Sequence, residues 1–492
     1  MSRYKNFCGP SYVSLAAAAN SERTVNLFPE VIEAATPKNK MALIGTPGDT
    51  VFVDLGIGPV RGMAAQDGRM FAVGGGSLFE VYADGTATNR GAVGIAVDPA
   101  VLVTNGQQGH QWLVISNGNG FIFDLVTNTL VQIPAAGFPA GVRSAVFVDG
   151  YFIVLIPGTS LFGLSGLLKG LEWDTLDRAA RSTASDNLIT VIADHREAWF
   201  FGSETMEVWI DSGNASFPFQ PLRGTVMQVG MVGHGWSLAT LRDEQAKCWL
   251  GKTDGGPRVF ATLIGYTPEP ISTHAVDLAI QGYGEEAQNA ARGYAYQEHG
   301  HTFYVLTFPT VGLAWVYDLT ESKKAQMPLW HERTRWNVTQ GVDEAPTGWN
   351  HCYAFGKHLV GSRDDGKIYS QSLTTYTHNG AMIRRVRRAP YINAEHRRLF
   401  FSRFELVGEW GVGLQTGQGS APTALLRWSD TGWKTASDFR SASLGPVGEY
   451  DTQPTWDQLG STPGDRGFEV VITDPIGIRL TDAYVDVEVG TH

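Results

Sequence analysis

Residues 112–124 read WLVISNGNGFIFD, and the fold of the chain can be predicted outward from this segment. Two apolar runs, at residues 112–115 and 121–123, flank a pair of Asn-Gly dipeptides. Asn-Gly tolerates the positive φ angles of a tight hairpin turn, while β-branched and aromatic residues favour extended backbone. The segment therefore predicts a β-hairpin, and a hairpin of this composition needs neighbouring sheets to cover both of its faces.

The same design recurs seven times between residues 70 and 369. Each copy has an apolar strand, a turn rich in Gly, Asn, Pro or Asp, and a second strand. The copies centre on Phe71, Trp112, Phe152, Trp199, Trp249, Phe303 and His358. Neighbouring centres are 40 to 55 residues apart, close to the ~40–50 residues of a propeller blade of about four strands. The pattern predicts an all-β protein with a β-propeller of seven blades or, alternatively, six.

The segments outside the repeats divide the chain further. Residues 1–40 lack the repeat and are expected to form an N-terminal arm, whereas residues 41–395 carry the β-propeller. Apolar runs in residues 396–492 favour a C-terminal β domain that resembles a small sandwich. An alternative is that the first C-terminal strand closes the last blade. Helical spacing is scarce, and its clearest case predicts a helix over residues 160–180, where four leucines recur.

Composition limits the classes of function. The net charge of −11 and the isoelectric point of about 5.6 argue against DNA wrapping or binding to an anionic membrane as the main activity. A mildly acidic wall would still let DNA slide past. The cysteines, Cys8, Cys248 and Cys352, form no CxxC pair, so we expect no disulfide framework and a buried free thiol at Cys248. No apolar stretch reaches the ~18 residues of a transmembrane helix.

Motifs that could carry chemistry are explained more simply as turns. His299-Gly300-His301 offers two metal ligands, but no third ligand follows at a suitable spacing. Asp364-Asp365-Gly366 resembles the start of a calcium loop and lacks the closing glutamate. The sequence shows no nucleophile–base pair and no cofactor fingerprint. We therefore expect no catalytic, metal-binding or cofactor-binding residues, and a protein that is not an enzyme.

An arginine cluster at residues 384–388 stands out in this acidic chain. It consists of Arg384, Arg385, Arg387 and Arg388. Such crowding favours an acidic surface opposite, on a neighbouring segment or another subunit, and a solvated face is the alternative. In an extended segment, alternation would send Arg385 and Arg387 to one side. We predict that these four arginines form an assembly contact.

Several short motifs occur in one order along almost the whole chain. Near the N-terminus they are Gly9-Pro10-Ser11-Tyr12, Arg23-Thr24-Val25-Asn26-Leu27-Phe28-Pro29-Glu30, Leu43-Ile44-Gly45-Thr46-Pro47-Gly48 and Arg61-Gly62-Met63. In the middle they are Phe201-Gly202-Ser203-Glu204-Thr205-Met206-Glu207-Val208-Trp209 and Pro270-Ile271-Ser272-Thr273-His274-Ala275-Val276. Near the C-terminus they are Trp428-Ser429-Asp430, Gly448-Glu449-Tyr450, Trp456-Asp457-Gln458-Leu459-Gly460 and Phe468-Glu469-Val470-Val471-Ile472-Thr473-Asp474-Pro475. Together they resemble the packaged-DNA stabilisation protein, or nozzle-type tail hub, of short-tailed phages related to P22.

This resemblance implies a structural virion protein of the tail that is made in the bacterial host cytoplasm. It implies a ring, expected to be a homohexamer, below the portal and its adaptor. The ring would close the DNA exit channel, stabilise packaged DNA until genome ejection, and carry tailspikes or fibres and the needle or plug. DNA would pass without sequence-specific binding, no membrane insertion is expected, and no catalytic residues are implied. The rival interpretations are a propeller glycan hydrolase or lyase and a cellular protein-binding propeller.

Overall fold

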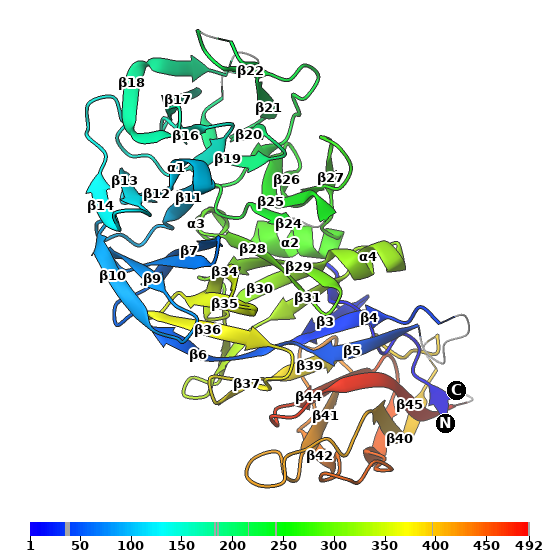
Figure 1. Ribbon diagram of the computed structural model, residues 1–492. Coiled ribbons are helices and arrows are strands. Elements are labelled where there is room, and N and C mark those ends of the chain that lie inside the picture. Colours follow the sequence, from blue (N-terminus) through cyan, green and yellow to red (C-terminus); the bar gives the residue numbers. More distant parts are fainter. Residues whose placement is uncertain are drawn as a thin grey trace.

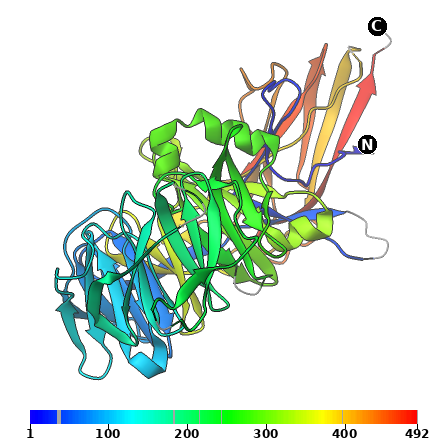
Figure 2. The same cartoon turned by 90° about the horizontal axis from the view of Figure 1, so that it is seen from above.

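A computed structural model describes residues 1–34, 40–181, 184, 186–214, 216–241, 244–395 and 397–490. Figure 1 shows small sheets arranged in a ring, from blue through green to yellow, beside a second β domain that holds the red C-terminal strand. Both chain ends lie in that second domain, and Figure 2 shows its long strands standing to one side of the propeller. The fold is all-β, as the sequence predicts.

Within the described residues the propeller has seven blades. Blade 1 contains β7 (Val60–Gln66), β8 (Arg69–Gly74), β9 (Ser77–Val81) and β10 (Ala87–Ala92). Blade 2 contains β11 (Val101–Thr104), β12 (Gln111–Ser116), β13 (Asn119–Asp124) and β14 (Thr129–Gln132). Blade 3 contains β15 (Ala145–Val148), β16 (Tyr151–Leu155), β17 (Leu161–Gly166) and β18 (Lys169–Ala180). Blade 4 contains β19 (Leu188–Asp194), β20 (Glu197–Gly202), β21 (Met206–Asp211) and β22 (Phe219–Pro221).

The remaining blades follow the same plan. Blade 5 contains β23 (Gly230–Met231), β24 (Ala239–Leu241), β25 (Ala246–Thr253), β26 (Gly256–Thr262) and β27 (Pro268–Pro270). Blade 6 contains β28 (Arg292–Glu298), β29 (His301–Phe308), β30 (Leu313–Asp318) and β31 (Trp330–Arg333). Blade 7 contains β34 (Gly348–Ala354), β35 (Lys357–Ser362), β36 (Lys367–Ser372) and β6 (Gly48–Asp54). In each blade, the repeat centre lies on the strand that follows the innermost strand. These centre-bearing strands are β8, β12, β16, β20, β25, β29 and β35.

The ring is closed by a strand that precedes blade 1 in the chain. β6 pairs antiparallel with β36, and Asp49 lies opposite Gln371 in that ladder. The alternative in which a C-terminal strand closes the last blade is therefore wrong. Pairing an early strand with the last blade joins distant parts of the chain and leaves no open edge at which the ring could separate.

The helix predicted over residues 160–180 is also wrong, because this segment forms the hairpin of β17 and β18. Its leucine spacing coincides with helical periodicity, but Gly163, Gly166 and Gly170 interrupt it, and glycine disfavours helix interiors. Leu168 adopts a φ angle of 57°, which places the turn of the hairpin. The four leucines of the predicted helix thus lie on β17 and in the turn that follows it.

Apolar side chains hold neighbouring blades together. On β8, Met70 and Ala72 pack toward blade 7, whereas Phe71 and Val73 pack toward blade 2. This alternation follows from the two-residue period of a strand, so one apolar run serves two interfaces. Trp112, Trp199 and Trp249, the repeat centres of blades 2, 4 and 5, are all buried between neighbouring blades.

Short helices and hairpins decorate the propeller. They are α1 (Gly106–Gly109), α2 (His274–Gly282), α3 (Glu285–Asn289), α4 (Leu319–Ala325), the pair β32 (Arg335–Asn337) and β33 (Val342–Glu344), and the pair β37 (Thr377–His378) and β38 (Ala381–Met382). Thr273 caps α2 by accepting a hydrogen bond from the Val276 N–H.

The second domain is a sandwich of two sheets. One has the order β4 (Leu27–Val31), β5 (Met41–Gly45), β45 (Arg479–Val489), β40 (Leu399–Gly408) and β43 (Thr455–Thr462), with β1 (Ser2–Arg3) paired to β45. The other contains β39 (Arg385–Arg388), β44 (Gly467–Ile472), β41 (Thr423–Ser429) and β42 (Arg440–Ser443). Tyr4, Phe404 and Phe468 belong to the core between them.

One sheet runs from the propeller into this second domain. β3 (Ser21–Val25) lies between β31 of blade 6 and β39, and β2 (Tyr12–Val13) pairs with β3. β3 is parallel to β31 and antiparallel to β39. The N-terminal residues therefore connect the two parts of the molecule through backbone hydrogen bonds. We call this contact between blade 6, β3 and β39 the domain junction.

Candidate functional sites: the axial cavity and the domain junction

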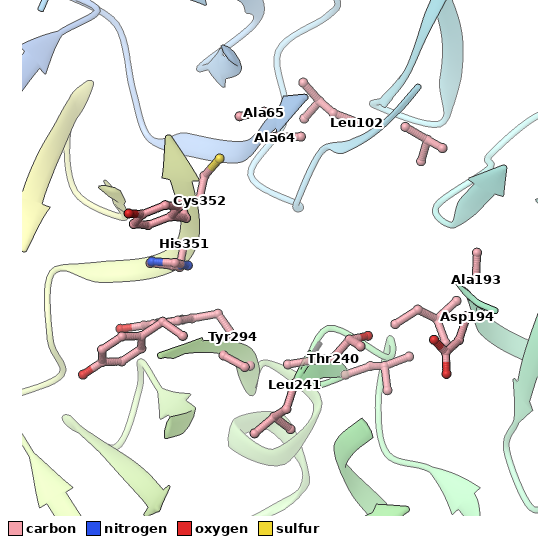
Figure 3. A pocket seen from close by; sticks show the side chains of 18 of the residues that line it. Ala64, Ala65, Leu102, Ala193, Asp194, Thr240, Leu241, Tyr294, His351 and Cys352 are labelled. Carbon is pink, nitrogen blue, oxygen red and sulfur yellow. The ribbon is translucent and has the colours of Figure 1, made fainter. Parts of the chain in front are cut away.

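The innermost strands of all seven blades enclose a cavity of about 1190 Å³. Figure 3 shows side chains from several blades facing this space, among them Ala64, Leu102, Thr240 and His351. Blades 1 to 5 contribute mostly small or aliphatic side chains, while blades 6 and 7 contribute aromatic ones. The cavity is a candidate ligand site because of its size, which is that of a small-molecule pocket.

The aromatic wall is a stack of tyrosine and histidine rings. His351 Nε2 and His358 Nδ1 lie 3.1 Å apart, so one of these rings donates a hydrogen bond to the other. The ring centroids of His351 and Tyr294 are 6.0 Å apart at an interplanar angle of 14°. Burial lowers the pKa of His351 to about 3 and also lowers the pKa of His358. Both rings are therefore neutral at physiological pH and act as packing groups in the wall.

The opposite wall carries charged groups that are already paired. Lys247 Nζ lies 2.5 Å from Asp194 Oδ2, and Arg196 Nε lies 2.7 Å from Asp149 Oδ1. Lys247 also lies over the ring of Trp199, 3.8 Å from its centroid. Each of these two carboxylates is thus paired with a cation of the same chain. Within the described residues, no group of three or more His, Cys, Asp or Glu could hold a metal ion.

The two metal-like motifs form turns. His299 and Gly300 adopt φ angles of 50° and 84° between β28 and β29, and His301 turns inward, where its Nδ1 lies 2.7 Å from Asp318 Oδ2. In the second motif, Asp364 accepts a hydrogen bond of 2.9 Å from Arg335. Cys8 and Cys248 are free thiols, and Cys248 is fully buried, as predicted. Burial alone raises the pKa of the Cys248 thiol far above its ordinary value.

Three arginines of the predicted cluster lie on β39, inside the domain junction, and Arg384 immediately precedes this strand. Alternation sends Arg385 and Arg387 to one side, as expected, but that side is the interior: they are 1% and 0% exposed. Arg387 Nη2 lies 2.6 Å from Glu22 on β3. Its guanidinium also donates to the carbonyls of residues 6, 7 and 10 and to the Thr24 hydroxyl. Of the two positions that the sequence left open for the acid, a neighbouring segment or another subunit, Glu22 occupies the first.

Arg385 is buried with fewer hydrogen-bond partners than Arg387. It donates a hydrogen bond of 3.3 Å to the Asp474 carbonyl, and its Nε and Nη2 atoms find no partner among the described residues. Burial lowers the pKa of Arg385 to about 10, against an opposing effect of Tyr376. A charge in this position is unfavourable on its own, so it depends on the neutral dipoles around it.

Arg388 and Arg384 point to other partners of the same chain. Arg388 Nε and Arg427 Nε donate to the two oxygens of buried Glu469, at 2.8 and 2.6 Å. Arg388 also lies over the ring of Trp433, at 4.1 Å from its centroid. Arg384 Nη1 lies 3.1 Å from Asp343 Oδ2. In the single chain, Arg384 therefore contacts a hairpin of the propeller and Arg387 contacts β3, whereas Arg385 and Arg388 bond residues of the second domain.

Comparison with protein families identifies the chain. Residues 20–376 match the family described as bacteriophage P22 Gp10, β-propeller. The chain belongs to this family. The matched range begins next to β3 and ends just after β36, so it covers the propeller together with β3 of the domain junction. This phage family agrees with the resemblance seen in the sequence. A comparison with curated proteins finds no match.

Solved structures with a similar arrangement are distant. The extracellular domain of a putative one component system from B. thetaiotaomicron aligns with 10% identity and a TM-score of 0.44, over 73% of this chain. This chain spans only 43% of that protein. The N-terminal domain of Nup159 aligns with 9% identity and a TM-score of 0.43, over 72% of this chain and 99% of that one. Among the described residues, no helix is long and apolar enough to cross a membrane.

Proposed function

We propose that this chain is a structural protein of a short-tailed phage virion, namely the tail hub below the portal and its adaptor. The observation that carries the proposal is the family match over residues 20–376, which spans the propeller. The paired charges and neutral histidines of the axial cavity support a role without catalysis. The protein would be made in the host cytoplasm and act in the virion tail.

The hub is a closed ring of identical subunits, with six as the expected number. A closed ring joins two different faces of each subunit, and a seven-bladed disc fused to a sandwich offers many loops for such contacts. The axial cavity within one chain has a volume of about 1190 Å³, which suits a small molecule and not a DNA duplex. The DNA therefore passes through the centre of the ring, between the subunits. The net charge of −11 suits a channel that DNA leaves without sequence-specific binding.

The hub holds the genome in place until ejection by contacts on several sides. Its partners are the portal adaptor, or head-to-tail connector, on one face and the tail needle or plug on the other. Tailspikes or tail fibres attach at its periphery. No cofactor and no membrane insertion belong to this function. The rigid domain junction supports it, because forces between head and tail would act across both parts of each subunit.

Negative-stain electron microscopy of the purified chain, alone and mixed with the adaptor of the same phage, tests this proposal. We expect closed rings with a central opening, formed by the chain alone or upon addition of the adaptor. Isolated monomers under both conditions would contradict the hub. Turnover on a panel of glycans, abolished by a single substitution of Asp149 or Asp194, would instead favour a propeller glycan hydrolase or lyase.

A further inference from the structure

A loop beside the propeller axis is held by two buried arginines. This loop, residues 94–99, connects β10 to β11. Arg61 donates hydrogen bonds to the carbonyls of Gly94 (3.2 Å) and Asp98 (2.7 Å), and Arg292 donates one to the carbonyl of Val97 (3.2 Å). Three carbonyls of one short loop are therefore fixed by side chains from blades 1 and 6.

The groups around Arg292 form one connected cluster, which we call the axial mouth. It consists of Asp98, Arg143, His234, Trp236, Arg292 and Trp349. Arg292 immediately precedes Gly293, which lines the axial cavity. Its guanidinium carbon lies 3.5 Å from the centroid of the Trp349 ring and 5.0 Å from that of Trp236. The two indoles hold the planar guanidinium in one orientation.

The axial mouth has more positive than negative charge. Arg143 lies 3.6 Å from Asp98, which is its carboxylate partner. Neither Arg61 nor Arg292 forms an ion pair in the described part of the chain, and Arg61 Nη2 is buried without a hydrogen-bond partner there. Three guanidinium groups thus share one carboxylate, in a chain whose net charge is −11.

The lowered pKa values in this cluster show that its positive charge is unfavourable. Burial lowers the pKa of Arg292 to about 9, against the effect of Asp98, and the nearby charge of Arg61 lowers it further. Burial and Arg143 likewise lower the pKa of His234, which leaves its ring neutral. A partly desolvated guanidinium without a carboxylate is stabilised by any anion that reaches it.

Apolar side chains project next to this charge. Ile95 is 85% exposed and Val97 is 75% exposed, although both belong to the loop whose carbonyls are fixed. A third exposed side chain, Ile57, packs near the adjacent Gly75. Rigid, exposed apolar side chains lose little entropy on binding, which favours a protein partner over solvent.

We propose that the axial mouth, together with Ile95 and Val97, is a docking surface for an acidic segment of a partner protein in which a carboxylate adjoins apolar side chains. The carboxylate accepts hydrogen bonds from Arg292, whose planar fork matches its geometry. The apolar side chains of the partner cover Ile95 and Val97. A phosphodiester backbone would satisfy the charge but leave both side chains exposed, so the surface favours protein over nucleic acid. The inference does not depend on ring formation.

Titration of the full chain with a blocked hexapeptide of alternating aspartate and leucine tests the proposal. Trp236 and Trp349 report binding by fluorescence, and calorimetry confirms it. We expect saturable binding that weakens by about tenfold or more in Arg292→Gln, because a charge-assisted hydrogen bond is lost. The matched control Arg403→Gln, in an exposed ion pair with Asp457 on the second domain, should bind like the parent.

Two further measurements test whether the apolar side chains contribute to binding and whether any anion would bind equally well. Ile95→Asp changes an exposed loop tip and leaves the fold intact, so it tests the apolar contact even where Arg292→Gln unfolds. We expect it to weaken binding of the peptide by about tenfold or more, since it adds repulsion and removes apolar contact. Absence of saturable binding would overturn the proposal. So would unchanged affinity in Ile95→Asp, or inorganic phosphate that binds as tightly as the peptide at equal ionic strength.

Discussion

The interface between blades 4 and 5 and the domain junction are both buried, yet they are built from opposite chemistry. Between the blades, Trp249 packs edge-on against Phe201, with ring centroids 5.2 Å apart, in a cluster made of apolar residues. At the junction, Arg387 and Glu22 form an ion pair of 2.6 Å inside a continuous sheet. The first interface is stabilised by removal of apolar surface from water and tolerates small shifts. The second depends on geometry, because a buried charge without its partner is strongly unfavourable.

This difference indicates that the blade interfaces and the domain junction have different roles in the fold. Blade interfaces repeat around the ring and consist mainly of matching apolar faces, to which ion pairs such as Lys247 with Asp194 are added. The junction occurs once in the described structure and fixes one orientation of the sandwich on blade 6, because Arg387 finds its acceptors only when residues 6–10, β3 and β39 are all in place. The predictions below test whether the two regions respond as differently as their chemistry implies.

The largest effect is expected in the blade interface. Trp249→Ala should lower the free energy of unfolding by about 3–5 kcal/mol, since it removes a fully buried indole and leaves a cavity. Urea denaturation measures the loss, and hydrogen exchange read by mass spectrometry should locate it in β20 and β25. An equal increase in hydrogen exchange at residues 385–388 would show that the blades and the junction unfold as one unit. The two regions would then not differ in their response.

A somewhat smaller effect is expected at the junction. Arg387→Met should cost about 3 kcal/mol, the lower end for a broken buried ion pair, because Glu22 keeps some contact with solvent. Faster hydrogen exchange should appear in β3, β39 and residues 6–10, while the blades keep their protection. If Arg387→Met unfolds no more easily than the parent protein, the ion pair does not secure the junction.

Acid should weaken the junction and spare the blade interface. Burial alone would raise the pKa of Glu469, but the Arg388 and Arg427 guanidiniums outweigh burial and hold this pKa below its ordinary value of 4.5. A carboxyl whose pKa is lowered by folding stabilises the fold above its unfolded pKa, and this contribution is lost as pH falls through the folded value. Exchange in β39 and β44 should therefore increase below about pH 4.5.

The matched control for the acid experiment is Glu469→Gln, which cannot titrate. We expect it to be less stable than the parent protein at pH 7 and to show a smaller further loss from β39 and β44 on acidification. Phe201, Trp249 and Phe260 of the Trp249 cluster carry no group that titrates near pH 4.5, so exchange at Trp249 and its neighbours in β25 should change less than exchange in β39 over the same range. An acid response in β25 as strong as that in β39 would contradict the assignment.

The propeller could be predicted from the sequence, whereas the junction could not, and the reason is the distance between interacting residues. A blade is encoded within about 50 residues, so Phe71 or Trp112 reveals its strand by its immediate neighbours. Arg387 is separated from Glu22 by 365 positions. The arginine cluster correctly indicated a need for acids, but its pattern does not say whether those acids belong to the same chain.

The two mistaken predictions have the same origin. The leucines of residues 160–180 satisfy helical spacing, and only the turn at Leu168 and the pairing of β17 with β18 decide for a hairpin. The closing strand β6 contains the apolar run Val51-Phe52-Val53, but it precedes the first repeat, and its pairing with β36 at the far end of the propeller is not visible in the local sequence. The burial of Arg61 and Arg292 beside a loop was not predicted either, because a single arginine in a sequence gives no sign of it.

The smallest effect is expected from an exposed ion pair of the second domain. Arg403 Nε lies 2.6 Å from Asp457 Oδ1, a distance equal to that between Arg387 and Glu22, but both side chains of this pair are about half exposed. Water and salt screen such a pair, so Arg403→Ala should leave the free energy of unfolding almost unchanged. Urea denaturation at low and high salt measures this difference, and the small effect should shrink further as salt rises. A loss as large as that of Arg387→Met would mean that distance, and not burial, determines the strength of ion pairs in this protein.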